Sequence, residues 1–463
     1  MRELARDLGV SHATAIVVGT IIGSGIFLVP SEMMQAVGSA KLVYLAWFVG
    51  GLLSFFGALT YAELGAMKPQ AGGEYIYVRD AYGPLGGFLY AWTTVIVSKP
   101  ASIATITTGF VRILGTFRLF SFFSNDLLTK PLAVTYGQLV AIAAAAFLSF
   151  LNYIGVKKAG EFQLVFTLLK VAIILATVGV CFGYREGGWS HFATRFLGAK
   201  GGIAGFMAAL VAALWAYDGW NDLNMVAGEV RNPQRNVPVA LIAGVAIVGM
   251  LYVLMNVAVQ YVLPASVIAL SPRPASVAIA LVAGALGASL VSGGMALSML
   301  VTLNGTTMSG ARVPFAAARD GYFFPSVARV HPRFLTPSVA IALQLGLATA
   351  LLLLGGSFQQ FFTLAIFAEW LFYMITASTV FVFRRREPNA ARPYRVWGYP
   401  VVPALFVLAA AVLLYYTFTE NLQASARGSS AVLVGMPVVV LAGIPVFYYF
   451  SRRPSEDRRK PKY

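Results

Sequence analysis

Two short stretches of the sequence place glycine and polar residues inside runs that are otherwise apolar. The first is G-T-I-I-G-S-G-I-F-L-V-P at residues 19–30, and the second is W-A-Y-D-G-W-N-D-L-N at residues 215–224. Glycine weakens a helix, and an interrupted helix exposes amide N–H groups at the start of one half and carbonyl groups at the end of the other. Two such interruptions could together bind a small solute that carries both a negative and a positive charge.

The small residues of the first stretch would let a ligand carboxylate approach backbone amides. The Gly-Ser-Gly run at residues 23–25 lies where the second half of the helix would begin, and a helix N-terminus attracts anions. Carbonyl groups near Ile21 and within residues 215–218 would receive an ammonium group. This chemistry suits an α-amino acid, although by itself it extends only to a small amphoteric solute. A packing role is the alternative, because Gly19 and Gly23 form a G-x-x-x-G pattern.

The elements around these stretches must be membrane-spanning helices. The 463 residues are 58% apolar and 11% charged, which is far from the balance of soluble proteins. A helix needs about 20 apolar residues to cross the hydrocarbon core, and the apolar runs lack the alternation of a β-barrel. About twelve runs are long enough, at residues 13–37, 42–66, 85–116, 132–154, 161–183, 202–228, 237–262, 276–310, 337–354, 358–383, 399–419 and 431–450. We expect the first to be retained, since no small-residue cleavage site follows it.

The distribution of basic residues predicts the orientation. The sequence holds 34 Lys and Arg residues against 18 Asp and Glu residues. Most of the basic residues, including those at 384–395 and 452–462, lie in segments that would be cytoplasmic if the N-terminus were cytoplasmic. We therefore expect both termini in the cytoplasm and a location in the plasma membrane. The partner of these charges is expected to be the lipid bilayer and not nucleic acid.

The sequence lacks the residue patterns of an enzyme or of a metal site. It contains no H-E-x-x-H, G-x-S-x-G or Walker motif, and His12, His191 and His331 are far apart. We expect no enzymatic activity, no metal and no cofactor. Cys181 is the single cysteine, which excludes an intrachain disulfide and is typical of a buried packing position. The connections are too short to hold a soluble domain, so function must lie within the helix bundle.

The two interrupted runs cross the membrane in opposite directions. They are the first and the sixth of the expected spans. Consecutive spans run in opposite directions, and an odd number of spans separates the start of the first from the start of the sixth. Paired broken helices in inverted repeats are typical of secondary transporters. We therefore interpret the protein as a transporter.

A set of motifs runs along nearly the whole chain. They are G-x-I-I-G-S-G-I-F at 19–27, Y-A-E-L at 61–64, K-P-A-S at 99–102, A-Y-D-G-W-N-D-L-N at 216–224, E-V-R-N-P-Q-R-N-V-P at 229–238 and R-x-P-F-A-A-A-R-D-G-x-x-F-P at 312–325. This set resembles the amino acid/polyamine/organocation (APC) superfamily, and most closely its L-type amino acid transporter branch. The resemblance implies an all-α membrane protein whose first and sixth helices are broken. It also implies two inverted five-helix repeats, at 1–183 and 184–398, with two extra helices and a basic tail at 399–463.

The resemblance also implies which residues contact the substrate. The residues expected at the carboxylate end are Gly23, Ser24, Gly25 and Ile26, and those expected at the amine end are Ile21, Trp215, Ala216 and Asp218. Trp215 stands at the position of an aromatic gate in the family, with an ordinary core aromatic as the alternative.

Asp218 departs from the family pattern, in which we expect a small residue. A charged side chain inside a membrane span costs about 2.5 to 3.5 kcal/mol on insertion scales, and such residues mark a pathway or a partner. Asp218 would strengthen recognition of the substrate amine, bind a proton or point into a cytoplasmic vestibule. Glu369, in F-A-E-W-L-F-Y, is likewise a carboxylate inside an expected span and would mark a pathway or a partner. The alternative is that it lies in a vestibule or in a contact between helices.

Two lysines lie inside expected spans. Lys170 is about 14 Å from Glu161 along the helix, at 1.5 Å per residue, and therefore lies near the middle of the membrane. The resemblance implies that its ammonium replaces a cation bound by sodium-coupled relatives and links the first span to the scaffold. A purely stabilising contact with carbonyl groups is the alternative. Lys99 precedes Pro100, and we expect it to contact a carbonyl group that the proline leaves free.

The sequence thus predicts a sodium-independent amino acid transporter that works by alternating access, most simply as an exchanger. Proton-coupled symport is the alternative mechanism, in which the buried Lys170 would be the coupling residue and would lose its proton during the cycle. An amino acid sensor on a transporter scaffold is the alternative of a different class. Apolar and aromatic residues near the second interruption favour neutral substrates. The loop R-L-F-S-F-F-S-N-D-L-L-T-K at 118–130 has no cysteine, so we expect no disulfide-linked partner subunit.

Overall fold

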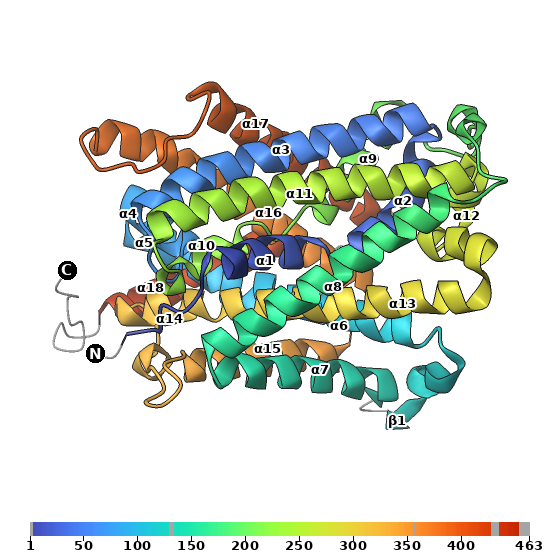
Figure 1. Ribbon diagram of the computed structural model, residues 1–463. Coiled ribbons are helices and arrows are strands. Elements are labelled where there is room, and N and C mark those ends of the chain that lie inside the picture. The colour runs from blue at the N-terminus through green and yellow to red at the C-terminus, as the bar shows by residue number, and fades with distance from the viewer. Residues whose placement is uncertain (1–2, 129–133, 356–357, 427–434, 453–463) are drawn as a thin grey trace.

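The fold is taken from a computed structural model that describes residues 3–128, 134–355, 358–426 and 435–452. Long helices run side by side along one direction and form a single bundle (Figure 1). A short antiparallel hairpin of β1 (Asp126–Leu128) and β2 (Val134–Thr135) lies at one end of the bundle.

Nearly all other elements are helical. In chain order the α-helices are α1 (Val10–Ile21), α2 (Gly25–Val37), α3 (Ala40–Met67), α4 (Glu74–Tyr82), α5 (Pro84–Thr93), α6 (Lys99–Leu114), α7 (Tyr136–Tyr153), α8 (Val156–Phe182), α9 (Gly202–Ala216), α10 (Asp222–Met225), α11 (Pro233–Val262), α12 (Ala265–Leu270), α13 (Pro274–Gly310), α14 (Arg312–Arg319), α15 (Ser338–Leu354), α16 (Phe358–Arg386), α17 (Val401–Ala426) and α18 (Met436–Ser451). The π-helical turn is η1 (Thr94–Ser98), and the 3₁₀ turns are η2 (Arg118–Ser124), η3 (Trp189–Ala193), η4 (Ala227–Glu229) and η5 (Pro325–Ala328).

Within the described residues, nine helical stretches are long and apolar enough to cross a membrane. Three shorter apolar helices, α9, α15 and α18, accompany them. Each of them overlaps one of the apolar runs expected from the sequence, of which residues 132–133 and 431–434 lie outside the described residues. The chain is therefore an integral membrane protein that crosses the bilayer several times.

Two helical stretches are interrupted near the centre of the bundle. α1 ends at Ile21 and α2 begins at Gly25, while α9 ends at Ala216 and α10 begins at Asp222. We call residues 22–24 the first break and residues 217–221 the second break. The second break touches the last turn of α1 at Gly219. The φ of 105° suits glycine, and an added Cβ would lie 2.9 Å from the Thr20 side chain.

Helices from distant parts of the chain enclose the breaks. α1 contacts α8, α11 and α13, α2 lies along α9, and α6 contacts α13 and α16. Figure 1 shows α1 in the middle of the bundle, with α11 on one side and α13 on the other. The backbone of both breaks is thereby buried inside protein, which is where a membrane protein tolerates irregular backbone.

The chain before α1 is fixed to the segment after α10. The Leu8 amide donates to the Glu229 carbonyl at 3.0 Å, and the Arg231 amide donates to the Leu8 carbonyl at 2.8 Å. The Glu229 carboxylate also pairs with the Arg312 guanidinium of α14 at 2.6 Å and 3.0 Å, and both side chains are fully buried. This connection holds the start of α1 against the far side of the second break.

Candidate functional site

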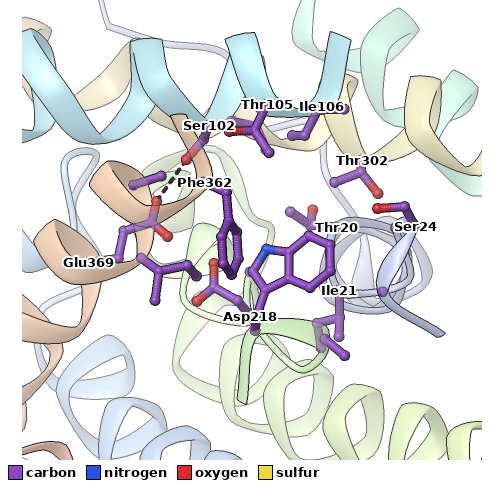
Figure 2. Close-up of a pocket in the computed structure, with 18 of the residues that line it drawn as sticks. Thr20, Ile21, Ser24, Ser102, Thr105, Ile106, Asp218, Thr302, Phe362 and Glu369 are labelled. Atoms are coloured by element: carbon purple, nitrogen blue, oxygen red, sulfur yellow. Dashed lines mark hydrogen bonds between the residues drawn. The ribbon is translucent and has the colours of Figure 1, made fainter. Parts of the chain in front are cut away.

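A cavity of about 80 Å³ lies where the two breaks meet. Its walls come from the two breaks and from α1, α2, α6, α9, α10, α13 and α16. In Figure 2, Ser24 and Thr302 lie at one side of this cavity, Glu369 lies at the opposite side, and Ser102 lies along the wall between them.

Most of the residues expected from the sequence to contact a substrate line this cavity. They are Ile21, Gly23, Ser24, Gly25, Trp215, Ala216 and Asp218. Ile26 is buried beside them but is not part of the lining. Lys170 is buried too, and its ammonium donates a hydrogen bond to a backbone carbonyl group behind the cavity wall.

The end of the cavity near Ser24 presents the start of a helix. α2 begins at Gly25, and the first amides of a helix have no carbonyl acceptor within that helix. The Gly23 amide bonds the Ile21 carbonyl at 2.8 Å and the Phe27 amide bonds the Ser24 carbonyl at 3.1 Å, so the amides of residues 24–26 between them are the ones that a ligand could bind. With the positive end of the helix dipole added, this end of the cavity can bind a carboxylate.

The three glycines of the first stretch have different roles. An added Cβ at Gly25 would lie 2.9 Å from Cα of Ala216, and one at Gly19 would overlap side chains of α8. At Gly23 the nearest atom, Oγ1 of Thr302, is 3.5 Å away, which is ordinary contact. Gly19 and Gly25 are therefore needed for close packing, whereas Gly23 adjoins open space on the cavity side.

Side chains from two other helices hold the carbonyl groups of the first break. Nζ of Lys170, on α8, lies 2.6 Å from the Gly19 carbonyl and 2.6 Å from the Ile22 carbonyl. On α13, Ser298 donates to the Ile22 carbonyl at 2.7 Å, and Thr302 lies 3.2 Å from the Gly19 and Ile22 carbonyls. A fixed ammonium and two hydroxyl groups thus occupy this group of carbonyls.

Tyr252, on α11, links the two breaks. Its hydroxyl group lies 3.0 Å from the Ile21 carbonyl and 2.8 Å from the Ala216 carbonyl. The side chain is completely buried. Tyr252 could not be identified from the sequence, because one tyrosine inside an apolar span follows no pattern.

The opposite end of the cavity contains a lysine among carboxylates. Nζ of Lys99 lies 2.7 Å from Oδ1 of Asp222 and 3.7 Å from Oε1 of Glu369. Our expectation that Lys99 contacts a carbonyl group freed by Pro100 is therefore wrong, because buried carboxylates provide a stronger partner for a buried ammonium. Ser102 donates to Glu369 at 3.2 Å (Figure 2).

Asp218 adds a further negative charge at this end. Its Oδ1 accepts a hydrogen bond from the Tyr373 hydroxyl group at 2.8 Å. Among the described residues that line the cavity, Asp218, Asp222 and Glu369 are acidic and Lys99 is basic. The excess of carboxylates attracts a positively charged group, so the two ends of the cavity suit opposite charges.

Aromatic rings close one wall of the cavity. The Trp215 ring, at the end of α9, meets the Phe362 ring of α16 edge to face, with 4.8 Å between the ring centres. Both side chains line the cavity, so separating α9 from α16 would open this wall.

Known proteins resemble this chain over nearly its full length. Residues 8–444 match the family described as amino acid permease. The serine/threonine exchanger SteT of Bacillus subtilis is 32% identical over 453 residues, which cover 97% of this chain and 98% of SteT. The b(0,+)-type amino acid transporter 1 of Homo sapiens is 32% identical, with 89% and 82% covered. The large neutral amino acids transporter small subunit 2 of Oryctolagus cuniculus is also 32% identical, with 97% and 82% covered.

Proposed function

Because the chain belongs to the amino acid permease family, in the L-type branch of the APC superfamily, we propose that it exchanges neutral amino acids without sodium. The observation that carries this proposal is the opposite polarity of the two ends of one cavity. The α-carboxylate of the substrate binds the amides near Ser24, and its α-ammonium points toward the second break and Asp218. Trp215 forms the gate over the bound amino acid.

The proposed architecture follows from the same family membership. Two inverted repeats, residues 1–183 and 184–398, each begin with a broken helix and contribute five of twelve spans. Two further spans and a basic tail form residues 399–463. Both termini lie in the cytoplasm, and the protein works in the plasma membrane by alternating access.

Sodium independence is supported by the contacts of Lys170. Its ammonium lies between the Gly19 and Ile22 carbonyls, 2.6 Å from each. A metal cation there would need the same carbonyl oxygens and would be repelled by the lysine charge. In this proposal the ammonium of Lys170 takes the place of the positive charge that sodium would otherwise provide.

Exchange of neutral substrates is supported by two relatives, whose names describe a serine/threonine exchanger and a transporter of large neutral amino acids. A proton-coupled symporter is the second candidate, because carboxylates outnumber the one lysine in the cavity lining. We expect no disulfide-linked subunit, because the chain's one cysteine, Cys181, is buried in α8.

Counterflow in proteoliposomes tests the proposal. Labelled L-serine should enter vesicles that contain unlabelled amino acid, and entry should be the same in sodium and choline buffers. A panel of the twenty amino acids as competitors should place neutral ones first. Accumulation in vesicles without internal amino acid, driven by a proton gradient and abolished by a protonophore, would favour the symporter. Binding without any flux would indicate a sensor.

A further inference from the structure

A buried carboxylate lies between two membrane-spanning stretches. Glu74 is the first residue of α4, which lies between the stretch that ends at Met67 and the one that begins at Pro84. In the proposed orientation this segment is on the cytoplasmic side. Only 1% of Glu74 is exposed. Its Oε1 accepts a hydrogen bond from Nδ2 of Asn221 at 3.1 Å, and its Oε2 accepts one from the Tyr90 hydroxyl group. Both of these donors are uncharged.

Glu74 differs in this respect from the other glutamates that are at most 1% exposed. Glu63 pairs with Arg384, and Glu229 pairs with Arg312. Among the residues that the structure describes, no basic side chain forms an ion pair with Glu74. A buried charge without an opposite charge is costly, and such a group binds a proton instead. Glu74 is therefore suited to gain and lose a proton, whereas the paired glutamates stay ionised.

A second cavity, of about 10 Å³, adjoins the Glu74 carboxylate. This is about the volume that one water molecule needs. Two of its lining residues, Lys99 and Glu369, also line the central cavity. Asn221, which bonds Glu74, also accepts a hydrogen bond from the Tyr373 hydroxyl group at 2.8 Å. Glu74 is thus connected to the second break and lies next to the wall of the central cavity.

The proton affinity of Glu74 depends on its burial. Burial raises the pKa of Glu74 to about 7, although the hydrogen bond from Tyr90 and the charge of Lys99 lower it. A glutamate in water has a pKa of about 4.3. The titratable groups that face the carboxylate come from five elements, and they are Tyr77 on α4 itself, Tyr61 on α3, Tyr90 on α5, Lys99 on α6, and Glu369 and Tyr373 on α16.

We propose that Glu74 is a proton-binding site that controls exchange, in which the protonated carboxyl group keeps the cytoplasmic side of the central cavity closed and loss of the proton favours opening. This inference rests on the proposed function, because it requires exchange by alternating access. When the second break moves away from α4, water reaches Glu74 and the carboxyl group ionises. The proton leaves and returns on the same side, so no proton crosses the membrane.

The direction of the pH effect follows from the two environments of Glu74. The closed protein binds the proton more tightly than the open one, so opening becomes easier as the pH rises from about 4.3, the pKa of an exposed glutamate. The effect ends near pH 7, where buried Glu74 also ionises. With equal pH on both sides of the membrane, we expect counterflow of L-serine to rise about tenfold between pH 6 and pH 8.

Glu74→Gln separates proton binding from hydrogen bonding. Glutamine keeps the size of the side chain and an acceptor oxygen, but it cannot ionise. We expect counterflow by this variant at pH 8 to be about tenfold slower than wild type and to be the same at pH 6. If Glu74 only accepted hydrogen bonds, the variant would keep the wild-type pH profile. The matched control is Glu161→Gln at the start of α8, where the side chain is 55% exposed, and it should keep that profile.

Tyr90→Phe tests the same site without changing the glutamate. The variant removes a hydrogen bond that favours the ionised form, so the pH above which counterflow stops rising should increase by about one unit. The matched control is Tyr77→Phe, which removes another fully buried hydroxyl group, 3.2 Å from Nδ2 of Asn224, and should leave that pH unchanged.

Infrared spectroscopy of the purified full-length protein measures the proton directly. We expect a carboxylic acid C=O band that disappears with a midpoint near pH 7 and that is absent in Glu74→Gln. Absence of such a band, or a wild-type pH profile in Glu74→Gln, would overturn the inference. If Glu74→Gln does not fold, an unchanged profile in Tyr90→Phe has the same consequence.

The proposed function and the role of Glu74 fail in different ways. A wild-type protein without counterflow at any pH would overturn the proposed function, and the control of exchange by Glu74 with it. A wild type that exchanges L-serine equally fast at pH 6 and pH 8 would remove only the role of Glu74.

Discussion

The two breaks satisfy their backbones in different ways. At the first break, the Gly19 and Ile22 carbonyls are held from outside by Lys170 and by hydroxyl groups of α13. The second break brings its own polar side chains. Asp218 and Asn221 both bond the Tyr373 hydroxyl group at 2.8 Å.

Because of this difference, the two breaks present different chemical groups to a ligand. The carbonyl groups of the first break are already occupied by a fixed ammonium, so its free amides near Ser24 remain for a ligand. The second break and the adjoining α10 and α16 offer the carboxylates of the cavity lining, of which only that of Asp222 lies within 3 Å of Lys99. In the proposed function, a zwitterion placed between the breaks would be oriented with its carboxylate toward α2 and its ammonium toward Asp218.

Among the substitutions that test this difference between the breaks, Gly23→Val should reduce exchange most. The site has room for a Cβ, since the nearest atom is 3.5 Å away, and the branched side chain would cover the amides that receive the carboxylate. We expect exchange to fall at least about 100-fold, or ~2.7 kcal/mol, with a nearly unchanged melting temperature. Gly25→Ala is the contrasting variant, because its Cβ would strike the Ala216 backbone and lower stability. Normal exchange by Gly23→Val would mean that the carboxylate binds elsewhere.

Lys170→Ala should have the next largest effect. The change removes a charged donor from the Gly19 and Ile22 carbonyls and loosens the first break from α8. Hydrogen bonds from charged groups contribute about 1.5 to 3 kcal/mol, so we expect exchange to slow at least about tenfold. The matched control is Lys157→Ala on the same helix, where the lysine is exposed. Counterflow at the wild-type rate would show that the lysine only fills space.

The sequence was sufficient to predict a helical protein that crosses the membrane several times, and to predict its family. Glycine and polar residues inside apolar runs predicted both interruptions, and the family prediction is confirmed by the match over residues 8–444. The depth of Lys170 along its helix placed it near the middle of the membrane, and the family resemblance placed its ammonium beside the first span, where the structure has it. These features depend on local pattern and on distance along one helix, which a single sequence contains.

The partners of individual side chains could not be predicted in the same way. Lys99 bonds Asp222, which is 123 positions away in the chain, and Tyr252 bonds Ile21, which is 231 positions away. Such pairs depend on how distant helices are placed against each other. A signal was available for Lys99 and Asp222, since opposite charges inside two apolar spans usually pair. Tyr252 gave none.

Asp218→Asn should have the smallest effect, and it isolates the charge of the second break. Asparagine keeps the size of the side chain and an oxygen that accepts the Tyr373 hydrogen bond, so only the negative charge is lost. Because Asp222 and Glu369 remain, we expect KM for L-serine to rise about threefold, or ~0.7 kcal/mol, with little change in kcat.

The contrasting variant for this last change is Asp222→Asn, which leaves the Lys99 ammonium buried without its nearest partner, 2.7 Å away. Breaking a buried pair on one side costs about 3 to 5 kcal/mol, so that protein should lose stability before it loses affinity. Exchange kinetics and melting temperatures, measured together for both variants, separate the two roles. If Asp218→Asn left KM unchanged, Asp218 would not recognise the amine. The orientation of the zwitterion would then rest on the amides of the first break and on the carbonyl groups that Tyr252 holds.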